Sequence, residues 1–135
     1  MTSAIYVENG VGRAVVEALN LFTRSHGVAA HFQHDVHPQM QRRQYGDEWW
    51  IRDVAGRGMA ILTQDCAILD NDDERDAVRS AGAKVIALGN GEYSVWSKLR
   101  CIAIHWNAIE TLLAGGGAGA AIAHLSKYEV RDLSR

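Results

Sequence analysis

Short apolar runs alternate with segments of helical periodicity along almost the whole chain, and this alternation limits the possible folds more than any other feature. The runs lack the polar alternation of a half-exposed strand, which is typical of strands covered on both faces. Strands that alternate with helices predict a mostly parallel sheet between two helical layers. We therefore expect a three-layer α/β/α fold with strands at residues 4–7, 28–32, 59–62, 84–88 and 120–125.

The expected helices lie between these strands. In the first, Val15, Ala18, Leu19 and Phe22 recur at helical spacing, and Gly27 is placed to end the helix. The sequence predicts helices at about residues 12–24, 47–56 and 73–81, and one long helix from about 94 to 113. A loop is expected at residues 34–46, which contain the only proline.

The long helix carries an apolar stripe that should face the core. The stripe consists of Trp96, Leu99, Ile102, Ala103, Trp106, Ile109 and Leu113. One member of the Trp49–Trp50 pair is expected to pack inward, leaving the other to stack on a base or to contact a partner.

Bulk properties favour one domain over residues 1–135. A hydrophobic content of 47% excludes disorder, and a net charge of −2 means that nucleic acid would need a local basic patch. The candidates are Arg42, Arg43 and Arg52 near the expected crevice, and Lys98 and Arg100 on the long helix, with an ordinary solvated surface as the alternative.

Residues 1–7 lack the pattern of a signal peptide, and no run of about 18 apolar residues is present to span a membrane. Cys66 and Cys101 show neither metal-ligand spacing nor a disulfide framework. These features predict a cytoplasmic protein without membrane association.

Four acidic residues stand where predicted strands end or helices begin: Glu8, the pair Asp47–Glu48, and Asp65. In an open α/β sheet these positions converge on the crevice outside the carboxyl ends of the strands. Carboxylates gathered there repel one another unless they share a proton or a cation. The pattern favours a divalent metal site of hard oxygen ligands, Mg²⁺ or Mn²⁺, suited to phosphodiester hydrolysis.

The acids also have ordinary interpretations, as turn residues and helix caps. We expect Asp47 to cap its helix and Glu48 to face inward as a ligand. Thr63 could hydrogen-bond a carboxylate or a substrate phosphate, and Arg13, one turn into the first helix, could bind a phosphate. A plain surface arginine is the alternative for Arg13.

Three segments at these residues, YVENGVGRAVVEAL, DEWWIRDVAGRG and MAILTQD, resemble the PIN-like domains of the VapC-type toxin group. The resemblance covers roughly residues 4–90, and its motifs correspond to Glu8, Asp47 or Glu48, and Asp65. It implies a compact α/β/α endoribonuclease that uses Mg²⁺ or Mn²⁺. It also implies an RNA substrate, a cognate antitoxin and a possible homodimer.

The chain departs from the family pattern at two places. Glu8 stands where the family normally has Asp, and its extra methylene moves the carboxylate outward. A fourth acid is not evident after the next strand, where Asn90 or Glu92 occupies the region. The alternative function is therefore a catalytically silent PIN-like module that binds RNA or a protein partner.

Two other patterns suggest ligands only weakly. His31, His34 and His37 have a spacing of three, but neither a strand nor a loop before Pro38 would put them on one face, so exposed loop histidines are the simpler interpretation. Gly10 and Gly12 follow the first strand as in a dinucleotide-binding turn, but Val15 occupies the third glycine position.

Overall fold

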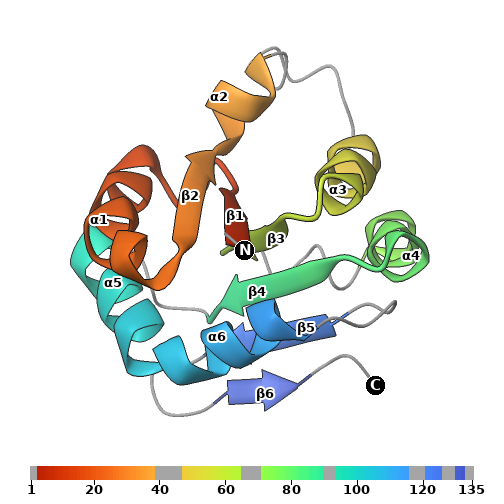
Figure 1. The fold of residues 1–135 in the computed structure, drawn as a ribbon. Helices are drawn as coiled ribbons and strands as arrows, with labels where there is room; N and C mark the ends of the chain where they lie inside the picture. The colour runs from red at the N-terminus through yellow and green to blue at the C-terminus, as the bar shows by residue number, and fades with distance from the viewer. Residues whose placement is uncertain are drawn as a thin grey trace.

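The computed structural model describes residues 3–38, 47–64, 71–89, 94–115, 121–125 and 130–132. The elements follow one another in the order expected of an α/β chain (Figure 1). They are β1 (Ser3–Val7), α1 (Arg13–Thr23), the 3₁₀ turn η1 (Arg24–His26), β2 (Val28–Phe32), α2 (Gln33–Val36), α3 (Asp47–Gly56), β3 (Ala60–Thr63), α4 (Asp72–Ala81), β4 (Lys84–Leu88), α5 (Val95–Ile104), α6 (Trp106–Ala114), β5 (Ala121–Leu125) and β6 (Val130–Asp132).

The strands form one six-stranded sheet in the order β2-β1-β3-β4-β5-β6. Every neighbouring pair from β2 to β5 is parallel, and only β6 runs antiparallel, against β5. In Figure 1, α1, α5 and α6 lie on one side of the sheet, and α3 and α4 lie on the other. The predicted three-layer fold with a mostly parallel sheet is therefore confirmed; β6 was not anticipated.

Alternate side chains of the strands feed two separate cores. Ile5 and Val7 of β1 belong to a cluster under α1, α5 and α6, whereas Tyr6 between them belongs to a cluster under α3 and α4. We call these the α1–α5–α6 core and the α3–α4 core. In β3 the same alternation sends Leu62 to the first and Ile61 to the second.

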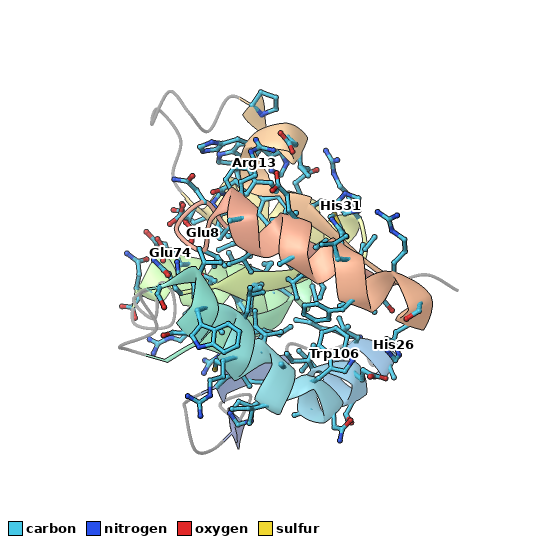
Figure 2. All side chains as sticks on the ribbon, turned by 90° about the vertical axis from the view of Figure 1, so that its left-hand side faces the viewer. Glu8, Arg13, His26, His31, Glu74 and Trp106 are labelled. Atoms are coloured by element: carbon cyan, nitrogen blue, oxygen red, sulfur yellow. The ribbon has the colours of Figure 1, made fainter. Side chains whose placement is uncertain are left out.

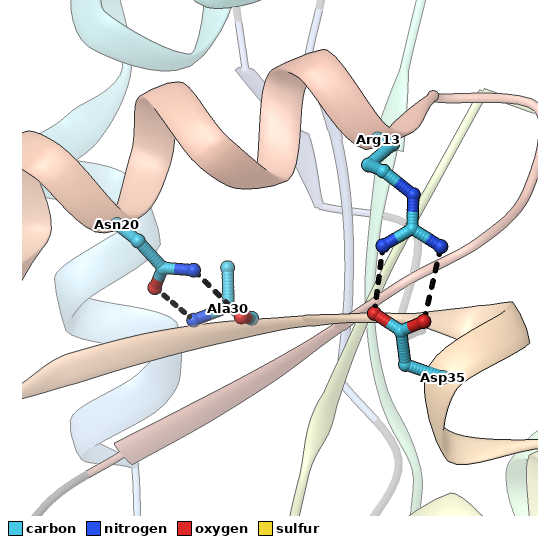
Figure 3. A network of polar contacts seen from close by, with 4 residues as sticks. All are labelled: Arg13, Asn20, Ala30 and Asp35. Atoms are coloured by element: carbon cyan, nitrogen blue, oxygen red, sulfur yellow. Dashed lines mark hydrogen bonds and ion pairs between the residues drawn. The ribbon is translucent and has the colours of Figure 1, made fainter.

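The edge strand β2 is bonded by a side chain from α1 (Figure 3). Asn20 donates from Nδ2 to the carbonyl of Ala30 at 2.9 Å, and its Oδ1 accepts from the Ala30 amide at 2.8 Å. The side-chain amide thus bonds backbone groups at an edge that would otherwise be open to another strand.

The single long helix predicted at residues 94–113 is wrong. The chain bends at His105, and α5 packs beside α1 while α6 packs beside β4 and β5. The buried residues of α5 are Lys98, Cys101 and Ile102. Trp96, predicted to lie in the core, is 72% exposed, whereas Trp106 packs against the α1–α5–α6 core as expected.

The loop predicted at residues 34–46 begins with a short helix instead, since Gln33–Val36 form α2. Residues 39–46, which include the predicted basic residues Arg42 and Arg43, lie outside the described part of the chain.

Candidate functional site at the carboxyl ends of β1 and β3

Glu8 lies directly after β1, beside the end of the neighbouring strand β3. The Glu8 amide donates to the carbonyl of Leu62 at 2.9 Å, which continues the pairing of the two strands by one residue. Thr63, fully buried at the end of β3, has its Oγ1 3.4 Å from Oε2 of Glu8, a long hydrogen bond. Because β1 and β3 are neighbours in the sheet, Glu8 lies next to the end of the strand that leads to Asp65 in the sequence.

The turn after Glu8 folds back over its carboxylate. The Gly10 amide donates to Oε2 of Glu8 at 3.2 Å, and the Val11 amide donates to the Glu8 carbonyl at 3.0 Å. A Cβ added at Gly10 would lie 3.1 Å from that same Oε2, so the Glu8 side chain would have to shift by a few tenths of an ångström. Glycine at position 10 therefore permits the close approach of backbone to carboxylate.

Figure 2 views the molecule from the side of α1 and α5. Glu8, Arg13 and Glu74 lie toward the end at which α1 and α5 begin, and His26 and Trp106 lie toward the other end. Helices that follow parallel strands begin at the carboxyl edge of the sheet, so the Glu8 turn lies among the helix N-termini.

Lys98 of α5 reaches the same turn. Its ammonium donates to the carbonyls of Gly10 at 3.2 Å and Val11 at 3.0 Å, and only 7% of the residue is exposed. Burial lowers the pKa of Lys98, and the negative charge of Glu8 partly opposes that shift. The basic surface patch predicted at Lys98 and Arg100 is therefore wrong for Lys98, while Arg100 is exposed.

The first turn of α3 carries the acidic pair. Asp47 is half-buried, and its Oδ1 accepts a hydrogen bond from the indole Nε1 of Trp50 at 2.8 Å. Trp50 is the inward member of the tryptophan pair and stacks on Tyr6 of β1, with ring centroids 5.2 Å apart. Glu48 is also half-buried in that first turn.

A hydrogen-bonded chain ties β1 to the outer surface of α3. The Tyr6 hydroxyl lies 2.9 Å from Nδ1 of His37, whose Nε2 lies 2.6 Å from Oδ2 of Asp53. An ionised carboxylate only accepts, so Nε2 carries the proton and, in the neutral ring, Nδ1 accepts from Tyr6. Arg57 donates to the same Asp53 oxygen at 2.9 Å.

The electrostatics of this chain follow from its burial. Burial raises the pKa of Tyr6 far above its ordinary value, and the charges of Glu8, Asp47 and Asp53 add to the effect. The hydrogen bond from His37 holds the pKa of Asp53 below its ordinary value, helped by Arg57. The negative charges of Glu8 and Asp47 therefore both act on the Tyr6 hydroxyl.

His37 is 2% exposed, so its interpretation as an exposed loop histidine was wrong. Its partner Tyr6 lies 31 residues away, and no local sequence pattern marks such a pair. His34 packs edge-on against Phe32, and His31 is exposed. The three histidines of the H-x-x-H-x-x-H pattern therefore lie in three different environments and do not converge on one site.

Arg13 is engaged by a neighbouring acid rather than directed at Glu8 (Figure 3). Its guanidinium makes a two-pronged contact with Asp35 of α2, at 2.8 and 3.0 Å, and lies 4.6 Å from the centroid of the Phe32 ring. The Arg13 hydrogen bond lowers the pKa of Asp35. Both side chains are more than half exposed, so a phosphate can reach Arg13 only in competition with Asp35.

Asp65 lies outside the described residues, as do Asn90 and Glu92. Within the described ranges, no three His, Cys, Asp or Glu side chains are grouped closely enough to hold a metal ion. The described chain therefore shows Glu8 beside Thr63, and Asp47 with Glu48 on α3, without assembling a complete metal site.

Comparison with known families decides the assignment. A family model described as "PIN like domain" matches residues 4–90, well over half of the chain. The chain belongs to the PIN-like domain family. Its fold is therefore of a nuclease type, as the resemblance of the three sequence segments implied. Comparisons with curated proteins and with solved structures gave no match. In the described part of this PIN-like domain, no helix is long and apolar enough to cross a membrane.

Proposed function

We propose that this PIN-like domain is a metal-dependent endoribonuclease. The observation that carries the proposal is the Glu8 carboxylate at the end of β1, beside Thr63 at the end of the adjacent β3. In this arrangement Asp65, two residues beyond Thr63, follows the strand that neighbours Glu8. This edge is where ligands bind in open parallel sheets.

The carboxylate oxygens of Glu8, Glu48 or Asp47, and Asp65 match the hard-oxygen preference of Mg²⁺ and Mn²⁺. Glu8 and the α3 pair lie within the described residues, and Asp65 is proposed from the sequence as the third ligand. A bound divalent ion would supply Lewis-acid activation of a water and would stabilise charge on the leaving oxygen.

The remaining roles fall to the chain's own groups. Thr63 orients Glu8 through its hydroxyl, or alternatively donates to a substrate phosphate, and the Trp50 indole holds Asp47 in one orientation. Arg13 is proposed to bind a substrate phosphate after exchanging Asp35 for it, since both anions present two oxygens to a guanidinium.

The test is cleavage of a single-stranded RNA with and without Mn²⁺, comparing the wild type with Asp65→Asn and Glu8→Gln. We expect Mn²⁺-dependent cleavage that falls at least about 100-fold in both variants, because each loses a charged ligand. Glu17→Gln on the exposed face of α1 is the matched control and should cleave as the wild type does. Equal cleavage by the wild type and Asp65→Asn contradicts the proposal.

The biological setting that we propose is a cytoplasmic toxin that pairs with an antitoxin and acts as a homodimer. This rests on the similarity to the toxin group. A small reading frame with a DNA-binding motif directly upstream of the gene would support it, and co-purification of its product with this protein would test it.

A second candidate function, a silent PIN-like module that binds RNA or protein, is favoured by one observation. Glu8 is longer than the family's Asp, and its Oε2 already accepts hydrogen bonds from Gly10 and Thr63. Calorimetric titration with Mn²⁺ separates the two functions, because a silent module shows no specific uptake.

A further inference from the structure

Within the described part of the chain, the buried Lys98 donates to two backbone carbonyls, and this burial needs a structural reason because removing an ammonium from water is costly. Lys98 lies on α5, beneath the α1–α5–α6 layer, and extends to the carboxyl edge of the sheet. Its two acceptors, the carbonyls of Gly10 and Val11, lie more than 80 residues away in the chain. Among the described residues, these are the hydrogen bonds that join α5 to the turn.

Gly10 and Val11, the two residues that accept hydrogen bonds from Lys98, also donate hydrogen bonds to Glu8. The Gly10 amide donates to the Glu8 side chain and the Val11 amide donates to the Glu8 carbonyl, while the carbonyls of Gly10 and Val11 accept from Lys98. The turn is therefore bonded to Glu8 on one side and to α5 on the other. A shift of this turn moves the Glu8 carboxylate.

We propose that Lys98 is a positioning residue of the acidic site, which fixes the Glu8 carboxylate by anchoring the Gly10–Val11 turn to α5. The part of this inference that concerns metal binding rests on the proposed function. The anchoring itself is a property of the protein without metal. Lys98 explains how a glutamate, longer and more mobile than the family's aspartate, is held in one place.

When Lys98 is removed, a purely electrostatic role and a positioning role predict opposite changes in Mn²⁺ affinity. A nearby ammonium repels a divalent cation, so its loss alone would tighten Mn²⁺ binding. Loss of the anchor would instead loosen the Glu8 turn and weaken binding, as losses of outer-shell support do, by about 10–100-fold. The sign of the change therefore separates a positioning role from a purely electrostatic one.

The experiment compares Lys98→Met with Arg100→Met, which removes the same charge from an exposed site on the same helix. Two quantities are measured: Mn²⁺ affinity by calorimetry, and hydrogen exchange of the Gly10 and Val11 amides in the metal-free protein. We expect Lys98→Met to bind Mn²⁺ about 10–100-fold more weakly and to exchange both amides faster. Arg100→Met should change neither.

Unchanged or tighter Mn²⁺ binding in Lys98→Met overturns the proposal, and so do unchanged Gly10 and Val11 amides. If the wild type takes up no Mn²⁺, the proposed function fails, and the amide exchange alone decides whether Lys98 anchors the turn. If Lys98→Met does not fold, Lys98→Gln is measured in the same way. That variant keeps one donor without the charge and should show a smaller loss in the same direction.

Discussion

The two faces of the sheet are built differently. The α1–α5–α6 core is almost entirely aliphatic, with Val, Leu, Ile and Ala side chains from five strands and three helices. The α3–α4 core is smaller and contains Tyr6 and Trp50, with the buried His37 hydrogen-bonded at its margin. Aliphatic packing tolerates changes of shape, whereas hydrogen-bonded aromatic groups require one geometry.

Each face of the sheet has a different task. The aliphatic face contains the larger cluster of buried residues, whose burial stabilises the fold. The aromatic face fixes α3 against β1, and with it the orientation of Asp47. Lys98 is the exception, because it belongs to the aliphatic side and acts at the carboxyl edge.

The largest effect on stability is expected at Leu19, which is 1% exposed in the aliphatic core. Leu19→Ala should lower the free energy of unfolding by about 2–5 kcal/mol, through lost burial and the cavity left behind. Urea denaturation measures it. Leu21→Ala, at an 82% exposed position of the same helix, is the control and should stay within about 0.5 kcal/mol. A weaker Mn²⁺ affinity in folded Leu19→Ala would contradict the division of tasks.

A smaller loss of stability but a larger loss of metal affinity is expected at Trp50. Trp50→Phe keeps a ring over Tyr6 but removes the indole donor to Asp47, and should cost about 1–3 kcal/mol of unfolding free energy. Because Asp47 loses its orienting partner, Mn²⁺ should bind about 10-fold more weakly or worse. Thermal denaturation and calorimetry measure the two effects.

Trp96→Phe is the matched control, since Trp96 is 72% exposed. It should leave both stability and Mn²⁺ affinity unchanged. If Trp50→Phe binds Mn²⁺ as tightly as the wild type does, the α3 carboxylates do not depend on the aromatic face for their orientation.

Much of the fold could be predicted from the sequence because it depends on local pattern. The apolar runs at β1, β3 and β4 mark their strands directly, and Gly27 marks the end of η1, the 3₁₀ turn that follows α1. The family match then agrees with the order of the segments around Glu8 and Thr63. Their adjacency follows from parallel strands whose connections lie on the two faces of the sheet.

The remainder depends on contacts distant in sequence. The inward face of α5 is set by its packing on α1 and by the bonds from Lys98 to the β1–α1 turn, so the lysine is buried and Trp96 is exposed. Hydrophobicity alone predicts the reverse. The burial of His37 likewise depends on Tyr6 and Asp53, which are brought together only by the completed fold.

A modest, pH-dependent effect is expected at Asp53, on the margin of the aromatic face. Its pKa is lowered in the folded protein, so its ionised form contributes stability above the unfolded value near 4, and this contribution is lost as the pH falls through the folded value. Asp53 is 39% exposed, so Asp53→Asn should cost only about 0.2–1 kcal/mol at neutral pH.

Denaturation of both proteins between pH 7 and pH 2 measures the difference, which should shrink toward the acid end. Asp76→Asn, an exposed acid on α4, controls for general loss of a carboxylate. A difference between wild type and Asp53→Asn that grows on acidification would show that the His37–Asp53 contact does not stabilise the ionised carboxyl.

The smallest effect is expected at Asp35, which holds Arg13 on the exposed end of the aliphatic layer. Asp35→Asn should leave the free energy of unfolding almost unchanged, because solvent screens the exposed pair. It releases the Arg13 guanidinium, so RNA should bind more tightly and the salt dependence of binding should steepen by about one phosphate contact. Asp73→Asn, which makes the same change of charge on α4, controls for the net charge. If the two variants bind RNA alike at every salt concentration, Arg13 contributes no phosphate contact, and the aliphatic face takes part in the site only through Lys98.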